Sequence, residues 1–122
     1  MEKKELVLKI AQILYSKKAQ DIVALDVSAL TVITDAMVIA SGRNVLQVKA
    51  LAEEVEDRLA EAGVEPLRKD GQRDARWIVL DYGTVLVHLF HTQEREFYRL
   101  DKLWEHENNR IPLPFDEAVS ET

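Results

Sequence analysis

The sequence predicts one α/β (α+β) domain, in which a mixed sheet of about five strands is flanked by helices. Three observations support this. The chain has 122 residues, the usual size of a single domain. Apolar side chains recur at helical spacing in several segments, and short apolar runs typical of strands separate them. Since helices and strands alternate along the chain, both are expected to share one core. The expected domain covers residues 1–106, followed by an acidic, mobile tail over residues 107–122.

Two helices are predicted in the first half of the chain. Residues 3–18 carry apolar side chains at helical spacing, with lysines on the opposite side. Residues 45–62 repeat an apolar residue at steps of three and four, which is the clearest helical pattern in the sequence. Ser41 or Asn44 is suited to cap the start of this second helix, and Gly63 is suited to the position just after its end.

Apolar runs predict strands in five places, the third of them weakly: residues 21–27, 36–40, 64–67, 77–80 and 84–90. The charged segment 68–76 contains Gly71 and is expected to be a loop or hairpin connection. Thr92 is expected to cap a last helix that runs through Trp104.

The hairpin formed by the last two predicted strands carries the most informative side chains. Because side chains alternate along a strand, each strand has one aliphatic face and one mixed face. The mixed faces hold Trp77, Val79 and Asp81 on the first strand, and Thr84, Leu86, His88 and Phe90 on the second. A two-residue turn at Tyr82 and Gly83 would pair Trp77 with His88 and unite the mixed faces. A three-residue turn would shift the register by one and separate them. We favour the united face, because it separates the aliphatic side chains from the aromatic and polar ones.

A face with aromatic and polar side chains suits protein recognition, because aromatic rings dominate interface energetics. The alternative is that Trp77 and His88 lie beneath the last helix as core residues. Both interpretations are left open by the sequence, as is the choice between a monomer and a homodimer.

Composition excludes several functional classes. The chain has no cysteine, which excludes disulfides, thiolate metal sites and cysteine nucleophiles. No apolar run approaches the length of a membrane span, and the N-terminus lacks the pattern of a secretory signal, so a cytoplasmic protein is expected. The net charge is −6, and much of it lies in the last 18 residues, with five acids and one base. An overall basic excess, which nucleic-acid binders usually have, is missing.

The motifs of common catalytic sites are missing as well. Phosphate-binding glycine loops and the nucleophile elbow do not occur. No strand carries the alternating carboxylates that hold two metal ions in nucleotidyl transfer, so Ser41 and Gly42 are interpreted as an ordinary strand-to-helix turn. His88 and His91 are expected on opposite faces of a strand, which does not favour zinc. We therefore expect no catalytic residue, no bound metal and no cofactor. One basic cluster is a candidate for RNA contact: Arg68, Lys69, Arg73 and Arg76.

Taken together, these residues resemble the ribosomal silencing factor family, also called Iojap-like. The resemblance is sharpest in Trp-Ile-Val-Leu-Asp-Tyr-Gly at 77–83, in Val-His-Leu-Phe at 87–90 and in Arg-Glu-Phe-Tyr at 95–98. Further matching segments are residues 18–22, 25–27, 38–42, 48–55 and 103–104. The chain departs from the family pattern at Ala36 and Met37, where aromatic residues are usual, so a role for these two positions is in doubt.

The resemblance implies a fold similar to that of nucleotidyltransferases, without their metal-binding carboxylates. It also implies binding to protein fourteen of the large ribosomal subunit, which sterically blocks association with the small subunit and represses translation, and a role in large-subunit biogenesis. The partner-binding residues we expect from the motif and the hairpin faces are Trp77, Val79, Asp81, Tyr82, His88, Phe90 and Tyr98. Arg95 is expected to hold Asp81 or the hairpin turn. The alternatives are a nucleotidyltransferase-like enzyme and a ribosomal RNA-binding module with a peripheral contact through the basic cluster.

Overall fold

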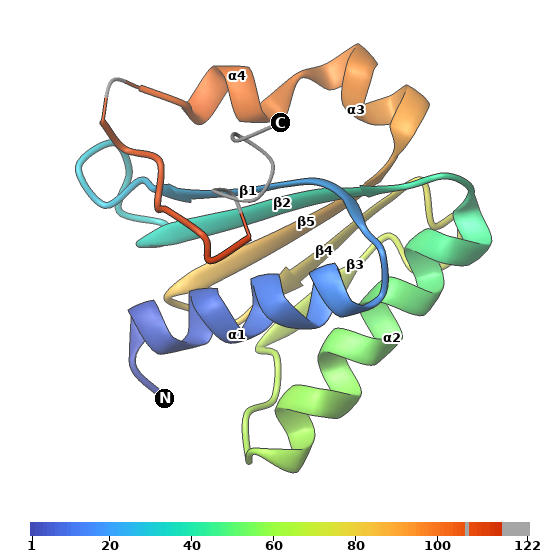
Figure 1. Cartoon of the computed structure of the whole chain (residues 1–122), viewed down its shortest axis with the longest axis horizontal. Coiled ribbons are helices and arrows are strands. Elements are labelled where there is room, and N and C mark those ends of the chain that lie inside the picture. The colour runs from blue at the N-terminus through green and yellow to red at the C-terminus, as the bar shows by residue number, and fades with distance from the viewer. Residues whose placement is uncertain (107, 116–122) are drawn as a thin grey trace.

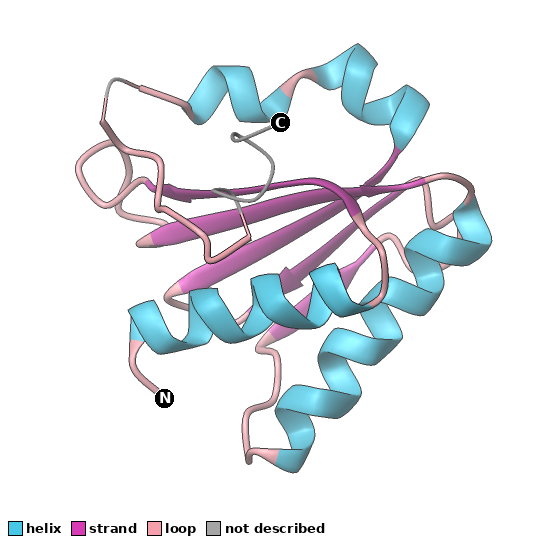
Figure 2. Cartoon of the chain, viewed as in Figure 1, coloured by secondary structure: helices cyan, strands magenta, loops and turns pink. Residues whose placement is uncertain are grey.

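The structure is a computed structural model that describes residues 1–106 and 108–115, without the side chains of residues 96–98, 100 and 101. Its helices and strands follow one another as shown in Figures 1 and 2. In chain order they are α1 (Lys3–Ser16), β1 (Gln20–Asp26), β2 (Ala36–Gly42), α2 (Val45–Glu61), β3 (Arg68–Asp70), β4 (Trp77–Asp81), β5 (Val85–His91), α3 (Thr92–Tyr98) and α4 (Leu100–Trp104).

The five strands form one mixed sheet in the order β1-β2-β5-β4-β3. Strands β2 and β5 pair in parallel, and the other three pairings are antiparallel. Helices α1 and α2 cover one face of the sheet, and α3 and α4 lie on the other (Figure 1). This arrangement confirms the predicted α+β class with a mixed five-stranded sheet.

The larger core lies between the sheet and the first two helices. The aliphatic faces of the central strands contribute to this core. They supply Ile78 and Leu80 from β4 and Val85, Val87 and Leu89 from β5, which are all fully buried. The apolar stripe of α2 packs here because its steps of three and four place those side chains on one side of the helix. Asn44 caps α2 by accepting a hydrogen bond from the Gln47 backbone N–H at 2.9 Å, which confirms one of the two predicted caps.

A smaller apolar cluster lies on the opposite face of the sheet. Its buried members are Val23, Leu25, Val27, Met37, Ile39 and Phe90, with Trp77, Leu86 and Trp104 packed against it. Met37 is 4% exposed and Ala36 is fully buried. The two positions that depart from the family pattern therefore act in packing and lie away from the surface.

Two predicted elements are wrong in their boundaries. The third strand is not at 64–67 but at Arg68–Asp70, where the sequence indicates a loop, because it pairs as an exposed edge strand with β4. Gly71 makes the turn into β4 at φ +88°, where a Cβ would lie 2.0 Å from the Trp77 carbonyl oxygen. The last predicted helix is broken in two at Arg99, whose φ of 50° ends α3, and its N-cap is His91 rather than Thr92.

The hairpin register differs from both predicted turns. Trp77 pairs with Phe90, Val79 with His88 and Asp81 with Leu86. This register is shifted by two residues from the favoured turn, so the parity of the strands is kept and the mixed faces are united as expected. The longer turn is held by the Asp81 side chain, whose Oδ1 accepts a hydrogen bond from the Gly83 N–H at 2.8 Å.

The segment after α4 is docked where the sequence predicts mobility. Leu113 is 3% exposed, and Ile111 and Phe115 also pack against the main core. The backbone N–H of Ile111 donates to the Ala24 carbonyl of edge strand β1 at 2.8 Å. The expectation of a mobile tail from residue 107 is therefore wrong for residues 108–115, and residues 116–122 lie outside the described part of the chain.

Candidate protein-binding face on β4 and β5

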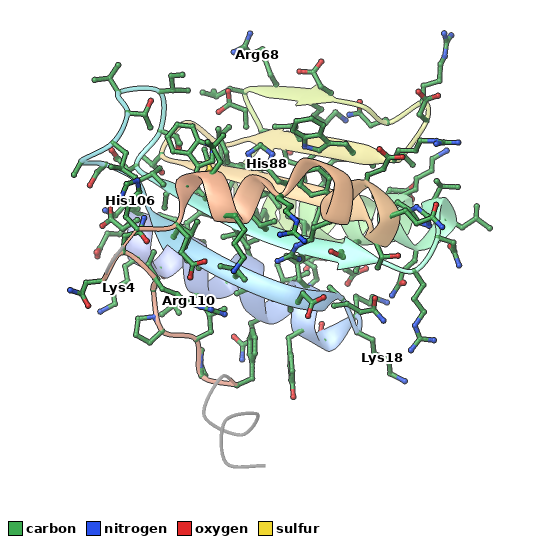
Figure 3. The ribbon with its side chains drawn as sticks, turned by 90° about the horizontal axis from the view of Figure 1, so that it is seen from above. Lys4, Lys18, Arg68, His88, His106 and Arg110 are labelled. Atoms are coloured by element: carbon green, nitrogen blue, oxygen red, sulfur yellow. The ribbon has the colours of Figure 1, made fainter. Side chains whose placement is uncertain are left out.

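Helices α3 and α4 leave part of their side of the sheet uncovered. Figure 3 looks down on this side, where the helices lie over β2 and β5, and β4 and β3 remain open beside them. We call this surface the open face and define it by five side chains: Trp77, Val79, Asp81, Leu86 and His88. Along β4, the residues that point to it are half-buried, whereas Ile78 and Leu80 between them are fully buried.

Trp77 is held in place by its neighbours on β5. Its indole N–H donates to Nδ1 of His88 at 3.1 Å, and its ring stacks on Phe90 with 4.9 Å between the ring centroids. Because the N–H is used inside the protein, a partner would meet the indole through its ring. A ring fixed in advance loses little rotamer freedom on binding, which favours affinity.

His88 is neutral in this setting. The side chain is 6% exposed, and burial lowers the pKa of His88 to about 4 from its usual 6.5. Since Nδ1 accepts the Trp77 hydrogen bond, the ring proton sits on Nε2. Nε2 is buried and has no hydrogen-bond partner in the described residues. The imidazole is therefore a structural support for Trp77 rather than an exposed charge.

This burial makes stability depend on pH. Below pH 6.5 His88 becomes protonated in the unfolded chain, whereas in the folded chain it stays neutral down to about pH 4. We expect the free energy of unfolding to fall as the pH drops from 6.5 towards 4, by up to roughly 1 kcal/mol per pH unit. Urea unfolding at about pH 7 and at about pH 5.5 measures this difference in the free energy of unfolding.

A His88→Gln variant is the control, because its side chain can accept the Trp77 hydrogen bond without titrating. It should show a weaker loss of stability between the two pH values than the natural chain. Equal pH dependence in the two chains would show that His88 is not the responsible group.

Asp81 closes the open face at the hairpin end. One of its oxygens is bound to the Gly83 N–H, and Arg68 Nη2 of β3 lies 3.8 Å from the other, with a side chain that is 80% exposed. Such an exposed ion pair contributes little to stability. Figure 3 shows Arg68 extending outward beside this face. The border of the open face therefore presents both a carboxylate, from Asp81, and the exposed guanidinium of Arg68.

The other expected contact residues are distributed differently. Tyr82 lies on the opposite face, in the core beneath α1 and α2, and is 8% exposed. Its burial, with the carboxylates of Glu56 and Glu65, raises the pKa of the Tyr82 hydroxyl. Phe90 is fully buried under Trp77 and supports it from below. Tyr98 lies outside the side chains that the structure describes. Tyr82 and Phe90 are thus not part of the open face.

The basic cluster predicted for RNA contact is largely paired with acids. Arg68 faces Asp81 as described, Lys69 Nζ lies 3.4 Å from Glu56, and Arg76 Nη1 lies 3.4 Å from Glu94. These pairs reduce the positive potential that phosphate groups would meet. Arg73 is exposed on the turn between β3 and β4. This arrangement weakens the RNA interpretation.

An apolar loop borders the open face and was not predicted from the sequence. Val32 and Ile33 lie between β1 and β2, with 103% and 74% of their surface exposed. Thr34 fixes the loop next to the hairpin turn, donating from Oγ1 to the Gly83 carbonyl at 3.2 Å. The run Leu30-Thr-Val-Ile at 30–33 is an apolar segment without strand partners, and this is the signal that could have identified it.

Arg95 does not reach the hairpin, contrary to expectation. Its guanidinium Nη1 donates to the Asp21 carbonyl of β1 and to the Ser41 hydroxyl of β2, the latter at 3.0 Å. It therefore joins α3 to the other end of the sheet. Among the side chains that the structure describes, no three acidic or histidine groups come together in a cluster that could bind a metal. Within residues 1–106 and 108–115, no helix combines the length and apolar character needed to cross a membrane.

The fold and the open face together define a small one-domain protein whose candidate site is a preorganised aromatic surface. Comparison with known proteins identifies its family. The family profile described as "Ribosomal silencing factor during starvation" matches residues 1–122. The chain belongs to this ribosomal silencing factor family, which confirms the resemblance seen in the sequence.

Individual relatives agree with this assignment. The chain is 41% identical over 88 residues to the ribosomal silencing factor of Bacillus subtilis, covering 72% of this chain and 75% of the relative. It is 38% identical over 104 residues to that of Halalkalibacterium halodurans, covering 85% and 89%. A crystal structure of a Chromobacterium violaceum protein superposes with a TM-score of 0.83 at 33% identity, covering 93% of this chain and 97% of that one.

Proposed function

We propose that this protein binds the large ribosomal subunit in the cytoplasm and represses translation by keeping the small subunit from joining. The partner within the subunit is protein fourteen, and the open face of β4 and β5 is the contact surface. The proposal rests on the family and on one observation. An aromatic ring and neighbouring apolar groups are held in place on a stretch of sheet that lies beside, and not beneath, the backbones of α3 and α4.

The open face has the composition of a protein interface. Trp77, Val79 and Leu86 supply apolar area at its centre, and the exposed Val32 and Ile33 extend that area past the hairpin turn. Asp81 and Arg68 provide charges at the border, where they can select a complementary partner without being desolvated. An apolar centre with a polar border is the usual anatomy of a specific contact.

Blocking subunit association requires no chemistry at this site. A protein of 14.0 kDa seated on the joining surface occupies space that the small subunit would otherwise fill. An interface of roughly 800 Å² on each partner is enough for a specific complex. The proposed mechanism is therefore steric, and the same contact is available during assembly of the large subunit.

Photo-crosslinking tests which ribosomal component meets the open face. A benzoylphenylalanine is introduced at position 68, whose side chain is already 80% exposed beside that face. A matched probe at position 46 replaces Leu46, which is 77% exposed on α2 at the opposite side of the sheet. Irradiation with purified large subunits should join the probe at 68, and not the one at 46, to protein fourteen.

Other outcomes would favour other functions. A crosslink from position 68 to ribosomal RNA alone would support the RNA-binding alternative. A crosslink to protein fourteen from position 46 alone would place the contact on the helical side. The enzyme alternative requires metal-dependent nucleotide turnover by the purified chain, a reaction for which the strands carry no alternating carboxylates.

A further inference from the structure

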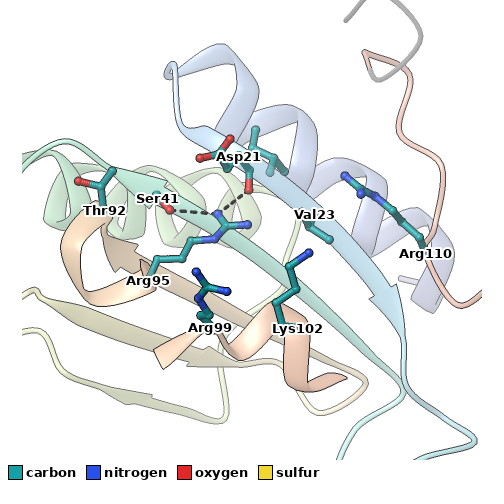
Figure 4. Close-up of a pocket in the computed structure, with 9 residues that line it drawn as sticks. Asp21, Val23, Ser41, Thr92, Arg95, Arg99, Lys102 and Arg110 are labelled. Atoms are coloured by element: carbon teal, nitrogen blue, oxygen red, sulfur yellow. Dashed lines mark hydrogen bonds between the residues drawn. The ribbon is translucent and has the colours of Figure 1, made fainter. Parts of the chain in front are cut away.

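A second site lies at the other end of the sheet, between edge strand β1 and the helices α3 and α4 (Figure 4). It is a cavity of about 460 Å³. Its polar lining comes from four separate parts of the chain: Asp21, Ser41, Thr92, Arg95, Arg99, Lys102 and Arg110. Four of these residues are cationic and one is acidic. Cations therefore outnumber acids among the side chains that line this cavity, on a chain whose total charge is −6.

Arg95 forms a fixed base for this cavity. It is 9% exposed, and its position is set by the Asp21 carbonyl and the Ser41 hydroxyl (Figure 4). Both of these acceptors are neutral oxygens, so these two hydrogen bonds fix the guanidinium without placing an opposite charge on it. Such a preorganised group loses little freedom when an anion binds to it.

The other cations stand around the cavity on exposed side chains. Arg99 lies at the junction of α3 and α4, Lys102 on α4, and Arg110 on the docked segment that follows. Arg110 reaches Glu105 at 3.8 Å, whereas Lys102 has no ion pair within the described part of the chain. Gathering like charges around one hollow raises the electrostatic energy, and a bound anion lowers it.

We propose that this cavity binds a small organic phosphate that carries at least two negative charges. Arginine and lysine are the side chains that recognise phosphate groups, and the hydroxyls of Ser41 and Thr92 can add hydrogen bonds. A volume of about 460 Å³ has room for a phosphate group together with an organic moiety. The cations lie around a hollow rather than along a stripe, and the chain is acidic overall, which favours a small ligand over a nucleic acid strand.

Calorimetric titration of the isolated chain tests this proposal without the ribosome. The probes are inorganic pyrophosphate and adenosine diphosphate at low salt. Each should bind saturably with one site per chain and more weakly at high salt. A bound ligand should also raise the melting temperature, since it stabilises only the folded state.

Two charge-reversal variants make the titration specific. Lys102→Glu places an acid at the exposed rim of the cavity, and we expect it to weaken binding of both probes at least about tenfold. Lys49→Glu changes the net charge equally on an exposed position of α2 and should leave binding unchanged.

Three results would overturn the proposal. One is no binding of either probe at up to about 10 mM, an affinity too weak to matter. Another is equal weakening by the two variants, which would indicate an unspecific charge effect. The third is binding of a short single-stranded RNA but of neither small probe. Because no ribosome is present, a failure to bind the two small probes leaves the proposed contact with the large subunit unaffected.

Discussion

Ending the chain at His106 is expected to lower the free energy of unfolding by about 4 kcal/mol, through loss of buried apolar groups and hydrogen bonds. The lost segment includes Leu113, which is 3% exposed, and Phe115, whose ring stacks on Tyr15 with centroids 4.2 Å apart. It also includes Asn109, whose backbone carbonyl accepts a hydrogen bond from the Asp26 N–H at 2.8 Å. Removing the segment uncovers edge strand β1 as well, which favours aggregation.

Denaturant unfolding of two truncated chains measures this effect. A chain that ends at Phe115 keeps all of these contacts and should be clearly more stable than the chain that ends at His106. In the full chain, Leu113→Ala alone should cost about 2–3 kcal/mol, because it leaves a cavity in the core. Unchanged stability of the chain that ends at His106 would show that the segment does not dock in solution.

Replacing Trp77 by alanine is expected to weaken binding to the large subunit at least about tenfold, which corresponds to roughly 1.4 kcal/mol. The ring is the largest side chain of the open face, and its stacking on Phe90 and bond to His88 hold it ready for a partner. The fold should survive the change, because Trp77 is only half-buried on β4. Cosedimentation with purified large subunits measures the affinity.

Two further variants separate the ring from its hydrogen bond and from general effects. Trp77→Phe keeps an aromatic ring but loses the N–H, which already points to His88 and not to the partner. Its binding should stay within about threefold of the natural chain. Leu46→Ala removes an exposed apolar group from α2 on the other side and should have no effect. Equal loss in Leu46→Ala and Trp77→Ala would argue against the open face.

The regular elements of the fold were predictable because their side chains follow simple periods. Helix α2 and the pair β4 and β5 could be identified from spacing alone. Strand β3 could not, because its three residues are charged and exposed and it exists through backbone pairing with β4. The break between α3 and α4 was equally hidden. It occurs at Arg99, with no glycine or proline to mark it.

Two errors came from patterns that the sequence does contain. Ile111, Leu113 and Phe115 alternate with prolines and polar residues, and this period of two directs all three towards the core. Tyr82 has the same parity as Ile78 and Leu80, so alternation along β4 places it on the aliphatic face. The family motif led us to expect Tyr82 on the contact surface, but its side chain lies in the core.

Most of the open face could be predicted, because one hairpin carries it and side chains alternate along each strand; the register that unites the two mixed faces is settled only by the strand pairing. The cationic cavity was not, because its residues are separated by up to 89 positions, from Asp21 to Arg110. Only the order of the strands and the docking of residues 108–115 bring them together. The pairing of Arg68, Lys69 and Arg76 with acids was hidden for the same reason, since two of the three partners lie on distant elements.

The most direct test of the central claim is a subunit-joining titration. Large subunits are mixed with increasing amounts of the natural chain or of Trp77→Ala, small subunits are added, and association is followed by light scattering. The proposed mechanism predicts that the natural chain suppresses joining in proportion to its occupancy of the large subunit. The Trp77→Ala chain should need at least about tenfold more protein for the same effect. If the natural chain saturates the large subunit while joining proceeds undiminished, the steric mechanism is wrong.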